Sequence, residues 1–247
     1  MKTRLLTPLL ALAVASATSQ AALVTWGAPT NIAGDSDVST AGTLVGAINL
    51  GSTGVTSPTV NTVAFTGLAV SGSSVTSGNF NLAFAPGSGL GDNSTGSGFA
   101  PFASLSAPYR GLLGTAGFAS GGSSVTLTMS SLTVGASYQF QFWTSYSGFI
   151  DVGGLTTATA GSAVSLSPQA TLNEGGLGQF ALGTFTANAA TQAITFTGTN
   201  PFIGPQINGF QLRQLAPPAV PEPGTALAGV MLAGLVGLRR RRMAAAV

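Results

Sequence analysis

Carboxylates are the side chains with the clearest capacity for chemistry in the central part of the chain, which contains Asp35, Asp37, Asp92, Asp151 and Glu174. Glycoside hydrolysis needs two carboxyl groups on either side of a cleft. Asp151 with Glu174 is one candidate pair, and Asp35 and Asp92 are further candidates for it. Five acids generate many such pairs by chance, so we expect no catalytic residue and keep a polysaccharide-degrading enzyme only as an alternative.

Two of these acids, Asp35 and Asp37, stand one residue apart in the segment GDSDVST. Calcium takes several carboxylate and carbonyl oxygens, so this pair is a candidate for a structural calcium ion. The competing interpretation is a turn in which Asp side chains accept hydrogen bonds from backbone amides. Asp92 and Asn93, in GDNSTGSG, allow the same two interpretations. We favour the turn in both segments and expect no other cofactor.

The chain contains neither histidine nor cysteine. Nucleophile systems of the Ser-His-Asp and Cys-His types are therefore excluded. The usual zinc, copper and haem sites are excluded for the same reason. The fold must also form without disulfides, and a domain of this size can bury enough apolar surface to do so.

Aromatic side chains in FWTSYSGFI suggest a different chemistry, namely stacking on sugar rings. If Phe142 faces the core, strand alternation turns Trp143 to the other side, near Tyr146 and Phe149. An outward Trp beside a Tyr suits a carbohydrate-binding module, with Trp143 and Tyr146 as glycan contacts. Core or edge packing of these aromatic residues is the competing interpretation, and it is the one that we favour.

Charge is scarce and unevenly placed. Charged residues make up 6% of the chain, against about 25% in typical soluble domains. From residue 22 to residue 224, two arginines face six carboxylates, a formal charge of −4. The remaining cations lie at the two ends of the chain, as Lys2, Arg4 and Arg239–Arg242. This part of the chain has no basic patch to neutralise phosphates, so nucleic acid is excluded as a partner.

Alternation of apolar and polar residues dominates residues 22–215. It is clearest in SVTLTMSSL (124–132), SYQFQFWTSY (137–146), QAITFTG (192–198) and INGFQLRQL (207–215). A period of two predicts strands with one buried and one wet face. Clusters of Gly, Ser, Asn and Pro separate these segments, and we see no amphipathic helix among them. We therefore predict an all-β fold, a single antiparallel β-sandwich of jelly-roll type over residues 22–215.

The first 21 residues have the order of an export signal. Lys2 and Arg4 precede the apolar run 5–14, and small residues follow. This order of charge, apolar run and small residues defines a signal peptide. We predict a signal helix over 1–21 and cleavage between Ala21 and Ala22 by signal peptidase.

The last 32 residues fall into three parts. Residues 216–224 are a Pro-rich linker, residues 225–238 are an uncharged run that predicts a short transmembrane helix, and residues 239–247 are a basic tail. Arginines stay on the cytoplasmic side of a membrane. Four of them would therefore stop transfer there, namely Arg239, Arg240, Arg241 and Arg242. A run this short is marginal for a permanent span, which takes about 20 residues, so we interpret it as a temporary anchor.

Pro221, Glu222 and Pro223, followed by an apolar helix and an arginine cluster, resemble the PEP-CTERM sorting signal of exported bacterial proteins. The resemblance implies that a membrane-embedded exosortase cleaves near the motif. It also implies transient residence in the bacterial inner membrane, then release to the cell surface or extracellular matrix. The five residues after the arginines depart slightly from the pattern.

The segments VTWGAPTNIAGDSDVSTAGTLVGAINLG and INGFQLRQL also resemble the two ends of a secreted β-sandwich module found with this signal. That resemblance implies an architecture and no activity. Our first hypothesis is therefore a non-catalytic surface or matrix protein in contact with exopolysaccharide. The carbohydrate-binding module and the polysaccharide-degrading enzyme remain the two alternatives.

Overall fold

The structure, a computed structural model, describes residues 22–85, 89–148, 154–199 and 203–217 of the 247-residue chain. The chain divides after Leu215 into two units, and the fold below is that of the first. No helix in the described ranges has the length and apolarity to span a membrane.

Several features predicted from the sequence lie outside the described residues, so they stay predictions. They are the signal segment 1–21, Phe149, Asp151, the motif 221–223, the apolar run 225–238 and the four arginines of the basic tail, Arg239, Arg240, Arg241 and Arg242.

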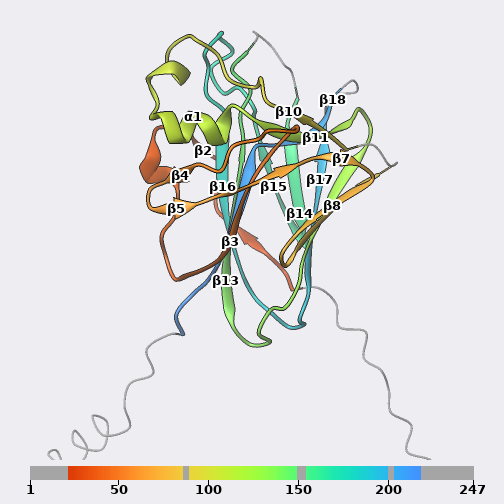
Figure 1. The fold of residues 1–247 in the computed structure, drawn as a ribbon. Helices are drawn as coiled ribbons and strands as arrows, with labels where there is room; N and C mark the ends of the chain where they lie inside the picture. Colours follow the sequence, from red (N-terminus) through yellow and green to blue (C-terminus); the bar gives the residue numbers. More distant parts are fainter. Residues whose placement is uncertain (1–21, 86–88, 149–153, 200–202, 218–247) are drawn as a thin grey trace, which may run out of the picture. The chain divides into compact units, whose positions relative to one another are not determined.

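The described residues form an all-β fold, as predicted, in two large sheets and two smaller ones (Figure 1). The seven-stranded sheet has the order β1-β16-β13-β19-β3-β6, and β2 also pairs with β16. Its strands are β1 Thr25–Trp26, β2 Thr30–Asn31, β3 Thr43–Gly51, β6 Thr66–Ala69, β13 Ser137–Thr144, β16 Gln179–Thr186 and β19 Gly209–Gln214.

The six-stranded sheet has the order β15-β14-β17-β12-β9-β8. Its strands are β8 Ser74–Ser77, β9 Phe80–Ala85, β12 Ser124–Met129, β14 Thr156–Ala160, β15 Ser162–Leu166 and β17 Gln192–Gly198. The four-stranded sheet, in the order β18-β11-β10-β7, comprises β7 Ser71–Gly72, β10 Gly89–Asp92, β11 Ala116–Ser120 and β18 Ile203–Ile207. A short hairpin joins β4 Thr59–Val60 to β5 Val63–Ala64.

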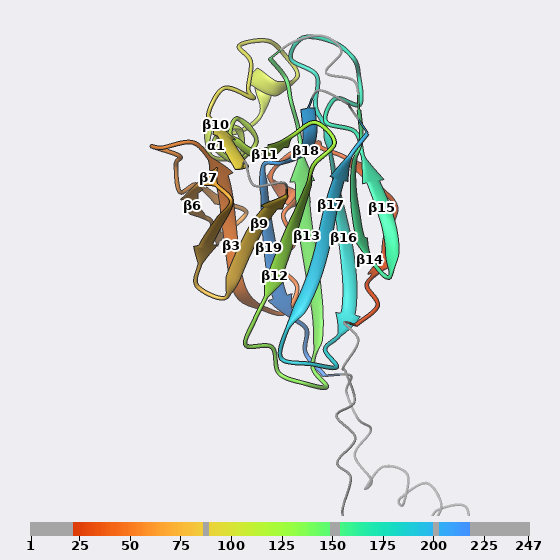
Figure 2. The same cartoon turned by 90° about the vertical axis from the view of Figure 1, so that its right-hand side faces the viewer.

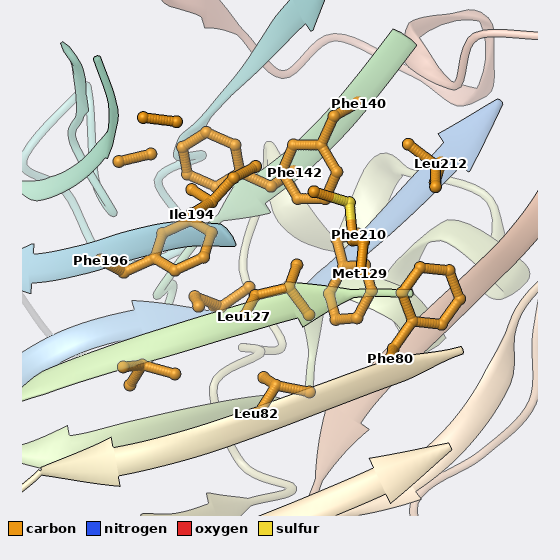
Figure 3. Close-up of a cluster of buried hydrophobic side chains, with 14 of the residues drawn as sticks. Phe80, Leu82, Leu127, Met129, Phe140, Phe142, Ile194, Phe196, Phe210 and Leu212 are labelled. Carbon is orange, nitrogen blue, oxygen red and sulfur yellow. The ribbon is translucent and has the colours of Figure 1, made fainter. Parts of the chain in front are cut away.

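Apolar residues at every second position place the core between the two large sheets (Figure 2). Figure 3 shows Phe140, Phe142 and Phe210 from the seven-stranded sheet gathered with Leu127 and Met129 from the six-stranded sheet. Each of these side chains is fully buried. The four alternating segments singled out in the sequence therefore contain strands β12, β13, β17 and β19, with the predicted apolar faces turned inward.

Two details differ from the prediction. The strands are not all antiparallel, because β3 pairs with β6 in parallel. The connection 52–65, which contains the β4–β5 hairpin, gives the chain the length to return in the same direction. A two-turn helix, α1 (Ala107–Leu113), also stands where we expected no helix. Seven residues are too few to show an amphipathic period in the sequence.

Candidate functional site

The outer face of the seven-stranded sheet does not face solvent, because a second apolar cluster packs on it. It is covered by η1 (Asp35–Asp37), the β4–β5 hairpin, η2 (Phe102–Ser104) and α1, which lie on one side of this sheet in Figure 1. Trp143 points into this cluster, and its ring meets that of Phe65 at 5.7 Å between centroids.

Trp143 does lie on the opposite face from Phe142, as predicted, and it is packed in a cluster, which is the interpretation that we favoured; the alternative of an exposed indole is wrong. Its exposed fraction is 0%. The cover comes from segments distant in sequence, which strand alternation alone cannot reveal. Since stacking on a sugar needs an open ring face, Trp143 is not a glycan contact in this fold.

A chain of hydrogen bonds runs from this indole to the Asp35–Asp37 segment. Nε1 of Trp143 donates to the Tyr109 hydroxyl at 3.1 Å. That hydroxyl donates in turn to Oδ2 of Asp37, also at 3.1 Å. Burial first, and then the Asp37 carboxylate, raise the pKa of Tyr109 well above its ordinary value. The phenol therefore stays protonated and serves as a structural donor.

Asp35 and Asp37 join η1 to α1. Oδ2 of Asp37 also accepts the amides of Ala33 and Gly34, at 2.7 and 3.0 Å. Oδ1 of Asp35 accepts the hydroxyl of Ser106, the N-cap residue of α1, at 2.6 Å. In the described part of the chain, no three His, Cys, Asp or Glu residues lie close enough together to hold a metal ion. The calcium site stays a prediction.

Asp92 orders its own loop, and Asn93 joins that loop to the loop after β3. Oδ1 of Asp92 accepts both the amide and the hydroxyl of Ser94, at 2.8 and 2.5 Å. Oδ1 of Asn93 accepts the Ser52 amide at 2.9 Å, and its Nδ2 donates to the Thr53 carbonyl at 3.2 Å. The loop after β3 and the loop after β10 are thus fixed against each other.

Tyr146 and Glu174 are the remaining predicted site residues that the structure describes. Tyr146 is half-buried, and burial and the Asp92 carboxylate raise its pKa. Glu174 is exposed in the loop 171–176. Because Asp151 lies outside the described residues, its pairing with Glu174 stays a prediction.

Residues 38–42, which we call the strap, are bound by hydrogen bonds to polar side chains on the outer face of the seven-stranded sheet. Gln141 accepts the Ser39 amide at 2.9 Å, and Gln211 donates to the Ser39 carbonyl at 3.0 Å. The Arg213 guanidinium donates to the Ala41 carbonyl at 2.7 Å, and also to the carbonyls on either side of it. The predicted wet face of β13 and β19 is therefore wrong, because the strap buries Gln141 and Gln211.

Three buried polar side chains fix the C-terminal end of α1. The last carbonyls of a helix lack partners within the helix. Here Asn49 donates to Gly111 at 3.3 Å, and both Thr95 and Asn208 donate to Leu113 at 2.8 Å. Each of the three donor residues is almost fully buried. The helix is thereby held rigidly against the ends of β3 and β19.

An open depression of about 460 Å³ lies beside this fixed helix end. Five glycines line it, and a Cβ added at Gly54 or Gly98 would meet no atom within 4 Å. Hydroxyl and amide side chains and one guanidinium provide the rest of its polar surface. The depression is lined by Gly54, Thr56, Asn93, Ser94, Gly96, Ser97, Gly98, Phe102, Arg110, Gly111, Gly114 and Thr115.

The depression lies at the opposite end of the domain from Leu23 and Leu215, near which the described part of the chain begins and ends. Leu215 donates its amide to the Ser137 carbonyl, at the start of β13. At the far end of β13, Ser145 donates its amide to Asn208, and Asn208 reaches the carbonyl of Thr115 in the depression wall. A strand of eight residues at about 3.3 Å each separates the two ends by roughly 25 Å.

The described lining residues of the depression offer groups for binding. None of these described residues is a carboxylate, so they provide no pair for general acid and base catalysis. Arg110 is exposed, and among the described residues its guanidinium has no hydrogen-bond or ion-pair partner. A free guanidinium among hydroxyls and amides suits an anionic, hydroxyl-bearing ligand.

Comparisons with protein-family models, curated proteins and solved structures give no match. We therefore infer the function from the chain's own residues.

Sequence reasoning missed this depression and had one usable signal for part of it. Arg110 and Arg213 are the two cations between residues 22 and 215. Because charged residues are so scarce there, each of these arginines is a candidate for a structural or binding role. Nothing in the sequence showed that Arg213 would be buried under the strap while Arg110 stays exposed. The residues that fix α1, such as Asn208, stand in no recognisable motif.

Proposed function

We propose that the protein is a non-catalytic cell-surface or matrix protein, exported through its N-terminal segment and sorted through its C-terminal segment. In this proposal signal peptidase removes residues 1–21. The run 225–238 holds the chain in the inner membrane until an exosortase acts near Pro221, Glu222 and Pro223. The folded residues are then delivered outside the cell.

The order of features at the C-terminus carries this proposal. The Pro-Glu-Pro motif, the uncharged run and the four arginines occur in the sequence in the order that such a signal requires. Arginines after an apolar run favour the cytoplasmic side, which leaves the preceding domain outside. The spacing of Arg239 from the motif is consistent with a short, temporary span.

The outer face of the six-stranded sheet supports a role in contact with polysaccharide. Its strands contain no charged residue among those described. Three neighbouring strands place hydroxyls in register, with Thr126 opposite Thr195 and Thr195 opposite Thr159. The next row is Ser124, Thr197 and Thr157. A neutral array of hydroxyls offers hydrogen bonds without the cost of removing charges from water.

We also interpret the two large sheets as a β-sandwich of jelly-roll type. The support is that both sheets contribute to one apolar cluster, with Phe142 from one and Phe196 from the other at 5.2 Å between ring centroids. The parallel pairing of β3 with β6 departs from an entirely antiparallel jelly roll. The role of an extracellular scaffold requires the sandwich and does not depend on the jelly-roll arrangement of its strands.

The proposal is tested by the intact mass of the protein recovered from the producing cells and their medium. We expect the extracellular form to lack residues 1–21 and everything after about residue 224. Recovery of an uncut, dissolved full-length chain from the cytosol would overturn the proposal.

Substitution of the motif provides a second prediction. Replacing Pro221 and Pro223 with Ala should leave the full C-terminal segment attached and increase the membrane-bound fraction, because the exosortase would no longer recognise its site. Pro217→Ala, in the same linker but outside the motif, is the matched control and should be processed normally. Equal processing of both variants would remove the role assigned to the motif.

A further inference from the structure

We propose that the depression beside α1 is a binding site for a carboxylated sugar, such as a uronate residue of an acidic polysaccharide, and that Arg110 binds its carboxylate. The proposal deepens the proposed function and rests on it for the extracellular setting of the ligand. The depression holds about 460 Å³, which is within the usual range for small-molecule sites.

The walls of the depression are formed before any ligand arrives. Asn93 fixes the loop 51–56 to the loop 92–98 through hydrogen bonds to Ser52 and Thr53. The Thr95 amide donates to the Gly114 carbonyl at 3.1 Å, which fixes the loop 92–98 to the end of α1. A pre-organised site loses little conformational entropy on binding.

Arg110 is available for a ligand in a way that Arg213 is not. Arg213 is 7% exposed and its guanidinium is occupied by strap carbonyls. Arg110 is exposed and without a partner in the described ranges. A guanidinium presents paired N–H donors that match a carboxylate, and such charge-assisted hydrogen bonds are about twice as strong as neutral ones.

The other lining groups favour a sugar over an acidic peptide. The Ser97 hydroxyl accepts the Phe99 amide at 3.0 Å, which leaves its own proton free to donate. The Thr56 hydroxyl has no hydrogen-bond partner among the described residues. Phe102, the one aromatic residue in the lining, is only 4% exposed and offers little apolar contact to a peptide side chain.

Position in the domain fits the same ligand. The depression lies at the far end from Leu215, beyond which the chain continues to its proposed anchor. A polymer outside the cell can therefore approach it without passing the attached end. Space is also available, since a Cβ added at Gly98 would meet no atom within 4 Å.

Binding should be measured with the full chain in detergent, by calorimetry at low salt and again at high salt. The first probe is a short oligogalacturonate. The second is the same oligosaccharide with its carboxylates methyl-esterified, which keeps the rings and removes the charge. The third is oligoglutamate, which keeps the charge and removes the hydroxyls. We expect binding of the first probe alone, weakened by salt because charges are involved.

Substitutions then assign the binding to the depression. Arg110→Gln should weaken oligogalacturonate binding roughly ten- to a hundred-fold, the loss expected for a hydrogen bond to a charged group. Arg110→Lys keeps the charge without the paired donors and should retain part of the affinity. Gly98→Glu places a negative charge in the open space and should abolish binding, whereas Thr186→Glu adds the same charge to the exposed end of β16 and should not.

Three outcomes would overturn the proposal. One is equal binding of the esterified sugar, which would exclude a carboxylate contact. Another is equal or tighter binding of oligoglutamate, which would identify a peptide site. The third is an affinity for oligogalacturonate that neither Arg110→Gln nor Gly98→Glu reduces. None of these depends on export or cleavage, so a failure here is distinct from a failure of the intact-mass test.

Discussion

At the scale of single residues, the buried hydrogen-bond chain from Trp143 through Tyr109 to Asp37 shows how aromatic and acidic residues serve structure in this domain. Both donors are fully buried, and each has its acceptor at 3.1 Å. A buried polar group that loses its partner incurs the full cost of its desolvation. The aromatic and acidic residues that suggested a functional site in the sequence therefore fix η1 and α1 over the sheet.

Tyr109→Phe tests this role. The change removes the acceptor of the Trp143 indole and one donor to Asp37, so we expect the free energy of unfolding to fall by about 1–3 kcal/mol. Urea unfolding monitored by tryptophan fluorescence measures the change. Thr126→Ala, on the outer face of β12, is the control and should change stability by about 0.5 kcal/mol or less.

The same residue predicts a pH dependence. The raised pKa of Tyr109 means that the unfolded chain loses this phenolic proton first, at about pH 10. The stability that Tyr109 contributes is therefore complete below about pH 10 and is lost as the pH rises above it. The difference in unfolding free energy between wild type and Tyr109→Phe should shrink on moving from neutral to strongly alkaline solution. A difference that stays constant or grows would contradict this assignment.

At the scale of elements, α1 depends on its neighbours more than on its own sequence. Seven residues are too few for a stable isolated helix. The Ser106 hydroxyl caps its first turn, and Asn49, Thr95 and Asn208 satisfy carbonyls in its last turn. The depression exists because these contacts hold the helix against the loop 92–98.

Asn208→Asp tests this dependence with a side chain of nearly the same shape. The Asn208 amide donates to the carbonyls of Leu113, Thr115 and Ser145. A carboxylate would present oxygens to those carbonyls and bury an unpaired charge, so we expect a loss of about 3 kcal/mol or more. Asn79→Asp, at an exposed position, is the control. Similar unfolding midpoints for the two variants would show that the amide does not hold α1.

Some elements of this fold could be predicted from the sequence alone, and others could not. Strands β12, β13, β17 and β19 could be predicted because alternation is a local signal with a direct physical cause. The cover over Trp143 could not, because it is assembled from two-residue strands, single 3-10 turns and a seven-residue helix. Such pieces carry no period, so the sequence does not distinguish a solvent-facing Gln141 from one buried under a strap.

At the scale of the whole domain, the described structure has two ends to which we assign different roles. The described chain ends come together at the first, where Leu23 and Leu215 line the same shallow surface. The depression and Arg110 lie at the other, about one strand length away. A domain attached through residues after Leu215 would therefore present its depression to the surroundings.

The absence of cysteine makes this arrangement measurable on spheroplasts, in which the outer face of the inner membrane is accessible. Gly98→Cys places a single thiol in the depression, and Thr186→Cys places one near Leu23 and Leu215. With the protein held in the inner membrane by its unprocessed C-terminus, a large maleimide reagent should label residue 98 faster than residue 186, because the membrane obstructs the attached end. In detergent the two rates should converge, since that obstruction is gone. Faster labelling of residue 186 on spheroplasts would show that the depression faces the membrane, which would leave no room there for an extracellular polymer.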